Sequence, residues 1–167
     1  MNIFRLHDDP EIAAQMHCDK HVVKMILESA QMLSTAHRVL DGDDYANENN
    51  LYKATHKNHP SNVWVRESSH NYSWLWLLFA ELLVEYKKRY NKVHACSKLQ
   101  SILFSEPRSL MYEPQHTKKQ KTLLPQCMPD QYKVEGDPVT AYRNYYKGEK
   151  AYFAKWAKGT AAPTWWN

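Results

Sequence analysis

The sequence predicts an all-α protein, a compact bundle of about four to five helices with two long helices and a long irregular loop near residues 105–136. Apolar residues recur at helical spacing over long stretches, and strict alternation of the strand type is nearly absent. Proline also stands where helices are expected to begin. The chain has 167 residues, so residues 1–167 are expected to form a single helical domain.

The first half of the chain begins with a short apolar lead-in over residues 1–8, which can hold one strand. Asp9-Pro10-Glu11 then opens a helix, because aspartate caps, proline suits the first turn and glutamate complements the helix dipole. This first long helix is predicted to run to Leu40, where Asp41-Gly42-Asp43 ends it. A short helix is expected within residues 44–57.

In the second half, Ser61 can cap a second long helix over residues 62–91. A short helix is expected over residues 95–104. Residues 105–136 contain four of the eight prolines and a basic run, and are predicted to be a long loop. The Asp-Pro device of the first helix then recurs and opens a last helix over residues 138–156.

Composition excludes some classes of enzyme. With four glycines the chain has neither a GxGxxG nor a Walker-type run, which argues against a dinucleotide-binding or P-loop fold. The net charge of +4 and pI of about 8.8 permit a nucleic-acid partner. The 13% of aromatic residues suits either base stacking or core packing.

Other features predict a cytoplasmic protein without a membrane partner. The three cysteines form no CxxC pair, and an odd number fits a reducing compartment. The first ten residues are too polar for a signal peptide. The longest apolar run, Trp74–Ala80, is far shorter than the ~20 residues that span a bilayer.

The first long helix carries the densest group of reactive side chains. At helical spacing one stripe holds His17, His21, Lys24, Glu28 and Gln31. One interpretation is a solvated face with a weak ion pair between Lys24 and Glu28. The other is a divalent metal cofactor, because His17 and His21 have the spacing of zinc-binding HExxH helices and His59 can supply a third ligand. The glutamate of that motif is missing here.

Two polar residues, Asp19 and His37, fall on the apolar face of the same helix. A buried charge is costly unless it is paired, so each is expected to find a partner elsewhere in the fold. The second long helix is interrupted in a similar way by Ser68 and Asn71. These two either bond to nearby backbone or line a substrate pocket together with Trp64.

The last helix combines a carboxylate with aromatic and basic residues. If its aromatic face is buried, desolvation would raise the pKa of Glu149 and suit it to acid–base catalysis. Pairing with a lysine or arginine of another helix is the alternative. The candidate substrate-binding residues here are Tyr142, Tyr146, Arg143 and Lys147, with Lys118, Lys119 and Lys121 of the loop as further phosphate contacts.

Several segments carry a family resemblance: MNIF at the start, DKHVVKMILESAQMLSTAHR at residues 19–38, and later NHP, MPDQY and YRNYYKGEKAYFAKW. They resemble a small family of bacteriophage-encoded proteins over nearly the whole chain. This resemblance implies an accessory role in the cytoplasm of an infected cell, acting on DNA or nucleotides or on a host protein.

A looser resemblance is to the phage pyrimidine-dimer DNA glycosylases, which are small, basic and all-α. These enzymes use the N-terminal amine of a small residue, exposed by methionine removal, with a glutamate beside the reacting sugar. Here Asn2 follows Met1, so methionine is expected to stay. The resemblance then implies that another amine, such as Lys24 near Glu28, serves as the nucleophile.

Three functions follow as hypotheses. The first is a DNA glycosylase or glycosylase/lyase in which Lys24 attacks, Glu28 or Glu149 moves protons and His21 assists. The second is a metal-dependent hydrolase that uses the histidine ligands, with Asp19 or Asp130 in support. The third is a non-enzymatic factor that binds a nucleotide or a host protein.

Overall fold

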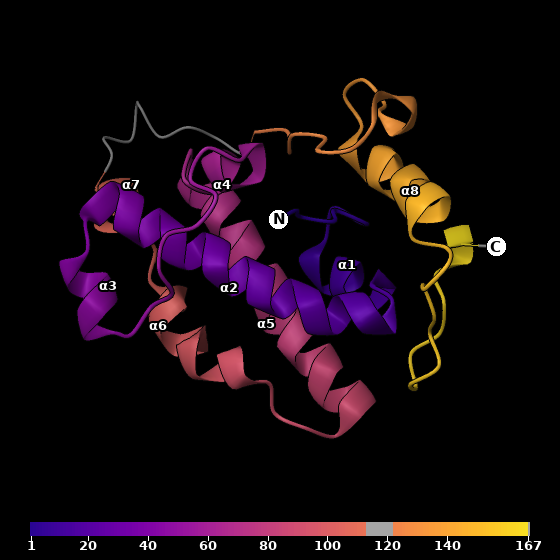
Figure 1. The fold of residues 1–167 in the computed structure, drawn as a ribbon, viewed down its shortest axis with the longest axis horizontal. Coiled ribbons are helices and arrows are strands. Elements are labelled where there is room, and N and C mark those ends of the chain that lie inside the picture. Colours follow the sequence, from indigo (N-terminus) through magenta and orange to yellow (C-terminus); the bar gives the residue numbers. More distant parts are fainter. Residues whose placement is uncertain (113–121, 167) are drawn as a thin grey trace.

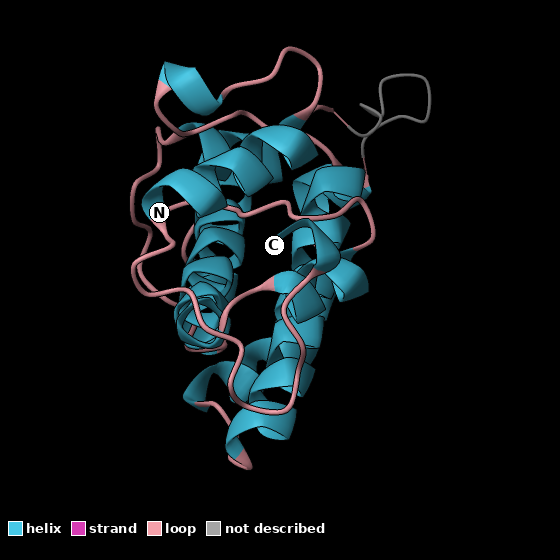
Figure 2. Cartoon of the chain, turned by 90° about the vertical axis from the view of Figure 1, so that its right-hand side faces the viewer, coloured by secondary structure: helices cyan, strands magenta, loops and turns pink. Residues whose placement is uncertain are grey.

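Helices make up the regular secondary structure of the computed structural model, which describes residues 1–112 and 122–166 (Figures 1 and 2). The all-α prediction is therefore confirmed. The elements are α1 (Pro10–Met16), α2 (Asp19–Asp41), α3 (Asp44–Glu48), α4 (Pro60–Val65), α5 (Ser69–Tyr90), η1 (Ala95–Leu99), α6 (Gln100–Phe104), α7 (Arg108–Met111), η2 (Asp130–Tyr132), α8 (Pro138–Glu149) and η3 (Thr164–Trp166). Within the described part of the chain, no helix has both the length and the apolar character that a membrane crossing requires.

The two long helices, α2 and α5, pack against each other at the centre of the fold (Figure 1). Helix α1 lies against α5, while α3, α4, α6 and α7 contact α2. Because neighbours surround α2, it buries polar residues such as His21 and Glu28 as well as apolar ones. A solvated polar stripe is therefore wrong for these two residues, whereas Lys24 on the same stripe is exposed.

The first predicted helix is divided into two by an extended break at His17 and Cys18. The local sequence does not predict this break, because the backbone groups there form hydrogen bonds with residues distant in the chain. The Cys18 amide donates to the Tyr146 hydroxyl at 3.1 Å, and the Asp19 amide donates to the Lys155 carbonyl at 2.9 Å. As a result, His17 and His21 do not share one helix, and the predicted stripe does not begin at His17.

Asp19 has the buried partner that the sequence requires. Arg89, whose side chain is fully buried, donates to Asp19 Oδ1 at 3.1 Å and to Glu85 Oε2 at 2.7 Å. It also donates to the carbonyls of Gln15 and His17 at 2.9 and 2.7 Å. This group, the Arg89 network, joins α1, the start of α2 and the end of α5.

The second predicted helix is also divided, at residues 66–68. Ser68 caps α5 by accepting from the Asn71 amide at 3.1 Å, and the Asn71 side chain donates to the Trp64 carbonyl at 2.9 Å. The backbone-bonding interpretation of Ser68 and Asn71 is therefore confirmed. His37 likewise has a partner, since its Nε2 lies 3.0 Å from the Tyr72 hydroxyl.

Two smaller expectations were wrong in the described part of the chain. Residues 1–8 form no strand and run as an irregular segment. The last helix ends at Glu149 rather than near residue 156. The described residues of the predicted loop 105–136 are mainly irregular and include the short helices α7 and η2. The predicted phosphate contacts Lys118, Lys119 and Lys121 lie outside the described residues.

Candidate active site

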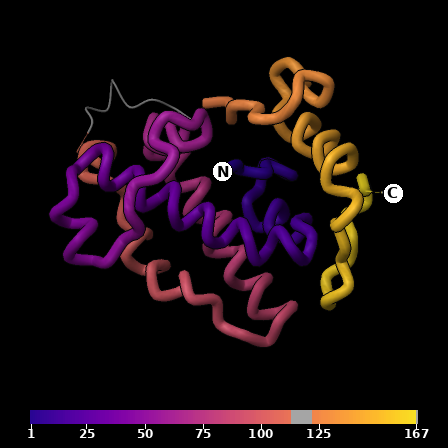
Figure 3. Tube along the Cα trace, in the orientation of Figure 1, coloured from indigo at the N-terminus to yellow at the C-terminus, as the bar shows by residue number. Residues whose placement is uncertain are grey.

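The start of the chain lies against Glu28 of α2, in the space between α2 and α8 (Figure 3). The α-amine of Met1 is 3.7 Å from Glu28 Oε2, and the Asn2 backbone nitrogen donates to the same oxygen at 2.9 Å. The other oxygen, Oε1, is 3.4 Å from Lys24 Nζ. Two amines therefore share one carboxylate, which can serve as a general base for a nucleophilic amine.

The residues that carry the two amines differ in the exposed fraction of their side chains. The Met1 side chain is 3% exposed, whereas that of Lys24 is 66% exposed. Glu28 is 12% exposed, so its carboxylate interacts with both amines in a partly desolvated setting where charges act more strongly than in water. Sequence reasoning paired Lys24 with Glu28 but missed the Met1 amine. The signal for an N-terminal amine was the resemblance to the pyrimidine-dimer glycosylases. The presence of Asn2 after Met1 argued against that amine and in favour of Lys24.

Asn2 is itself held by a segment far along the chain. Its Nδ2 donates to the Cys127 carbonyl at 3.0 Å, and its Oδ1 lies 2.8 Å from the Tyr142 hydroxyl of α8. Tyr142, a predicted stacking residue, is therefore buried beside Asn2 and not presented to a base. We name Met1, Asn2, Lys24, Glu28 and Tyr142 the amine site.

His59 lies near the amine site, and not with His17 and His21. Its Nδ1 accepts from the Ser61 amide at 3.2 Å and so caps α4. Burial lowers the pKa of His59, the positive charge of the chain's amine lowers it further, and Glu28 opposes this shift. The imidazole is therefore close enough to sense both charged groups of the site.

His17 and His21 lie in an aromatic cluster instead. Their ring centroids are 6.4 Å apart, and His21 packs against Phe4 at 4.5 Å and against Tyr146 at 5.0 Å. Among the described residues, no three histidine, cysteine or carboxylate side chains are grouped so that they could hold a metal ion. The three predicted ligands, His17, His21 and His59, are thus not brought together. Within the described part of the chain, the ring contacts of His21 are with aromatic residues and His17, and not with Glu28.

The aromatic cluster predicts acid-sensitive stability. Burial is the main cause that lowers the pKa of His17 to about 4 and of His21 to about 2, from 6.5. Below pH 6.5 these two histidines bind protons in the unfolded chain but stay neutral in the folded chain. The contribution of the two histidines to the free energy of unfolding should therefore be complete above pH 6.5. The free energy of unfolding should fall as the pH drops towards 4.

Urea unfolding at several pH values between 4 and 7 measures this slope. In a His17→Asn variant, whose amide can still donate to the Ala13 carbonyl as His17 Nδ1 does at 2.7 Å, the slope should be shallower. A His70→Asn variant, which removes an exposed histidine, is the control and should keep the wild-type slope. Equal slopes in all three proteins would contradict this account.

The remaining predicted site residues serve mainly structural contacts. Trp64 and Asn71 are buried and bond to Thr122, through its carbonyl at 3.1 Å and its hydroxyl at 2.8 Å. Arg143 donates to the Leu6 carbonyl at 2.9 Å, and Tyr146 is buried against Cys18. Trp64, Asn71 and Tyr146 are buried and not presented to a substrate, whereas Arg143 is half-buried.

Two of the predicted site residues on α8 are exposed. Lys147 points to solvent and can contact a phosphate. Glu149 is also exposed and accepts from the Tyr132 hydroxyl at 3.0 Å. The burial on which its acid–base role depended is therefore absent, whereas Glu28 is largely buried and lies against the Met1 amine and Lys24.

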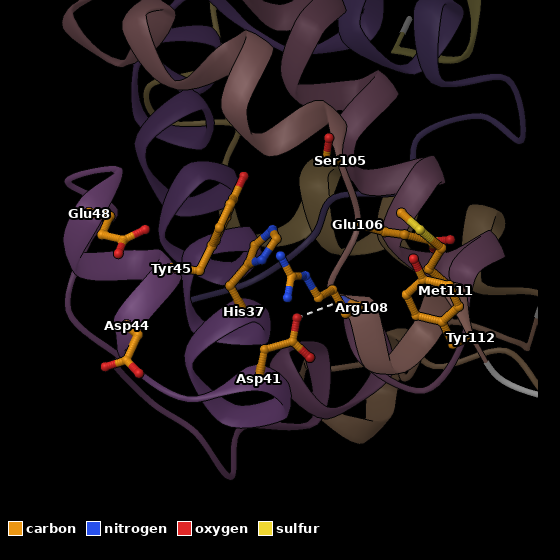
Figure 4. Close-up of a pocket in the computed structure, with 10 residues that line it drawn as sticks. All are labelled: His37, Asp41, Asp44, Tyr45, Glu48, Ser105, Glu106, Arg108, Met111 and Tyr112. Carbon is orange, nitrogen blue, oxygen red and sulfur yellow. Dashed lines mark hydrogen bonds between the residues drawn. The ribbon is translucent and has the colours of Figure 1, made fainter.

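A cavity of about 550 Å³ lies at the far end of α2, between α3 and α7 (Figure 4). Asp41 in its wall is more than three turns beyond Glu28, roughly 20 Å along the helix axis. The lining of the cavity has more carboxylates than basic side chains. The carboxylates come from Asp41, Asp44, Glu48 and Glu106, and Arg108 is the arginine that lines it. Such a charge balance repels phosphate, so the cavity is not suited to DNA.

The family model of the pyrimidine dimer DNA glycosylases matches residues 1–98, more than half of the chain. This range includes Met1, Lys24 and Glu28 but ends before Tyr142. No curated protein and no solved structure gave a match. The extent of the family match shows that this chain belongs to the pyrimidine dimer DNA glycosylase family.

Proposed function

We propose that this protein is a DNA glycosylase that releases one base of a pyrimidine dimer from its deoxyribose, with the α-amine of Met1 as nucleophile and Glu28 as its acid–base partner. The released base stays joined to its neighbour through the dimer, so base release means cleavage of the N-glycosidic bond. The observation that carries the proposal is the 3.7 Å contact between the amine and Glu28 Oε2. Family membership supports DNA as the substrate. The mildly basic net charge of +4 is compatible with binding its phosphates.

The chemistry requires an amine that is not protonated. The amine nitrogen attacks C1′ of the damaged nucleotide, and the bond from C1′ to the base breaks with its electron pair on the base, which takes up a proton. Glu28 accepts a proton from the attacking nitrogen. Glu28 passes this proton to O4′ as the bond between C1′ and O4′ opens, which gives a protonated imine. Water hydrolyses this imine and restores the amine.

The same imine permits strand cleavage. Loss of a proton from C2′ expels the 3′ phosphate as a leaving group, which gives a lyase product. Glu28 lies beside the nitrogen and is placed to accept that proton as well. The glycosylase and lyase steps therefore need one amine and one carboxylate, both of which the amine site provides.

Lys24 is the competing nucleophile. The Met1 amine is favoured because the Met1 side chain is buried and the start of the chain is held against Glu28, with the amine 3.7 Å from Oε2. The Asn2 nitrogen is also only 2.9 Å from Glu28 Oε2, so an amine at either of the first two residues would meet the carboxylate. Lys24 is exposed and better suited to contact a phosphate.

Borohydride trapping tests the proposal. The protein is incubated with a duplex that carries one cyclobutane pyrimidine dimer, with an undamaged duplex of the same sequence as the control, and with excess chelator in parallel. We expect a covalent protein–DNA adduct with the damaged duplex, at the same rate with chelator. Absence of both adduct and base release from dimer DNA would contradict the proposal. Loss of activity with chelator would favour the metal-dependent hydrolase.

The setting of the reaction belongs to the same proposal. A bacteriophage accessory protein that repairs DNA in the cytoplasm of the infected cell is the role that the sequence resemblance implies. The family match supports repair of DNA as that role.

A further inference from the structure

We infer that Tyr142 and Asn2 form a clamp that positions the amine against Glu28, so that Tyr142 is a positioning residue of the proposed reaction. This inference rests on the proposed function. It adds a residue from α8, beyond the part of the chain that the family model matches. Tyr142 was expected from the sequence to stack on a base, and its burial and contacts assign it another task.

The polar atoms of Asn2 are held from three directions. Its backbone nitrogen donates to Glu28, its Nδ2 donates to the Cys127 carbonyl, and its Oδ1 lies 2.8 Å from the Tyr142 hydroxyl. The same Oδ1 accepts from the Ile3 amide at 2.9 Å. With these bonds made, the Asn2 side chain has one orientation, and the amine one residue earlier is fixed beside the carboxylate.

The Tyr142 hydroxyl connects this residue to the loop before α8. It lies 2.9 Å from the Pro125 carbonyl and accepts from the Cys127 amide at 3.3 Å. Because a hydroxyl has one proton, it donates to Asn2 or to Pro125 at any moment. Burial also raises the pKa of Tyr142 far above its usual range, so the hydroxyl stays a donor throughout the working pH range.

Such a clamp matters because a chain terminus is otherwise among the least ordered parts of a protein. An amine must be held in a reactive geometry to attack efficiently, and a displacement of about 1 Å can cost about a hundredfold in rate. The clamp acts on the geometry of attack and not on the surface that binds DNA. Its loss should therefore lower kcat without a matching change in KM.

A Tyr142→Phe variant tests the inference by single-turnover trapping on dimer DNA. We expect the rate at saturating protein to fall about ten- to a hundredfold, with the half-saturating concentration within about twofold of wild type. The matched control is Tyr145→Phe, one turn along α8, whose hydroxyl accepts from Lys150 Nζ at 3.2 Å and has no bond to Asn2 in the structure. This control should keep the wild-type rate.

An Asn2→Asp variant provides a second test, with its melting temperature measured alongside to establish that it is folded. It keeps the acceptor for Tyr142 but replaces the donor to Cys127 with a negative oxygen, and the same fall in rate is expected. A wild-type rate in either folded variant overturns the clamp and leaves the proposed function standing. Absence of trapping by the wild-type protein overturns the proposed function itself. Equal losses in Tyr145→Phe and Tyr142→Phe also overturn the clamp.

Discussion

Replacement of Glu28 with glutamine is expected to slow base release from dimer DNA by about a thousandfold, within the 10²–10⁴ range of acid–base catalysis. Glutamine keeps an oxygen that can accept from the Asn2 amide, so the amine site should stay assembled. It cannot accept the proton that the attacking amine loses. The measurement is the single-turnover rate of base release, compared with the melting temperature of the same variant.

The control for this prediction is Glu135→Gln, which removes the same charge from an exposed position before α8. Its rate should lie within about twofold of wild type, so that a change in net charge alone is accounted for. A Glu28→Gln protein that is folded and releases base at the wild-type rate would show that Glu28 is not the catalytic carboxylate.

Replacement of Arg89 with methionine is expected to lower the free energy of unfolding by about 3–5 kcal/mol, since removal of one partner leaves buried charges uncompensated. Asp19 and Glu85 would lose their guanidinium partner, and the carbonyls of Gln15 and His17 would lose their donor. Urea or thermal unfolding at pH 7 measures this loss directly.

The matched control is Lys88→Met. Lys88 also pairs with Glu85, at 3.7 Å, but its side chain is 53% exposed. An exposed pair contributes about 0–1 kcal/mol, so this variant should remain close to wild type. Similar losses of stability in the two variants would mean that burial does not make the Arg89 ion pairs more stabilising than the exposed Lys88 pair.

Much of the helical fold could be predicted from local signals. Pro10 and Pro138 begin helices where the sequence places them, and the apolar spacing of α2 and α5 is readable in the chain. The breaks at residues 17–18 and 66–68 are different, because they depend on partners distant in sequence. Tyr146 and Lys155 supply the bonds at the first break, and no local pattern predicts them.

The candidate site shows the same division. Glu28 and Lys24 were paired from helical spacing, and the structure places them 3.4 Å apart. The Met1 amine reaches Glu28, and Asn2 reaches Tyr142, only because the chain start inserts between α2 and α8. Sequence spacing also placed His17 and His21 side by side as ligands, but the break at Cys18 and an aromatic environment give them another role.

The central claim is that the Met1 amine beside Glu28 attacks the damaged nucleotide. The most direct test is to trap the protein on dimer DNA with borohydride, digest the adduct with protease and nuclease, and map the modified peptide by mass spectrometry. We predict a deoxyribose remnant on the α-amine of the N-terminal peptide, and an undiminished adduct in a Lys24→Met variant. A remnant on Lys24, with loss of the adduct in Lys24→Met, would contradict the claim.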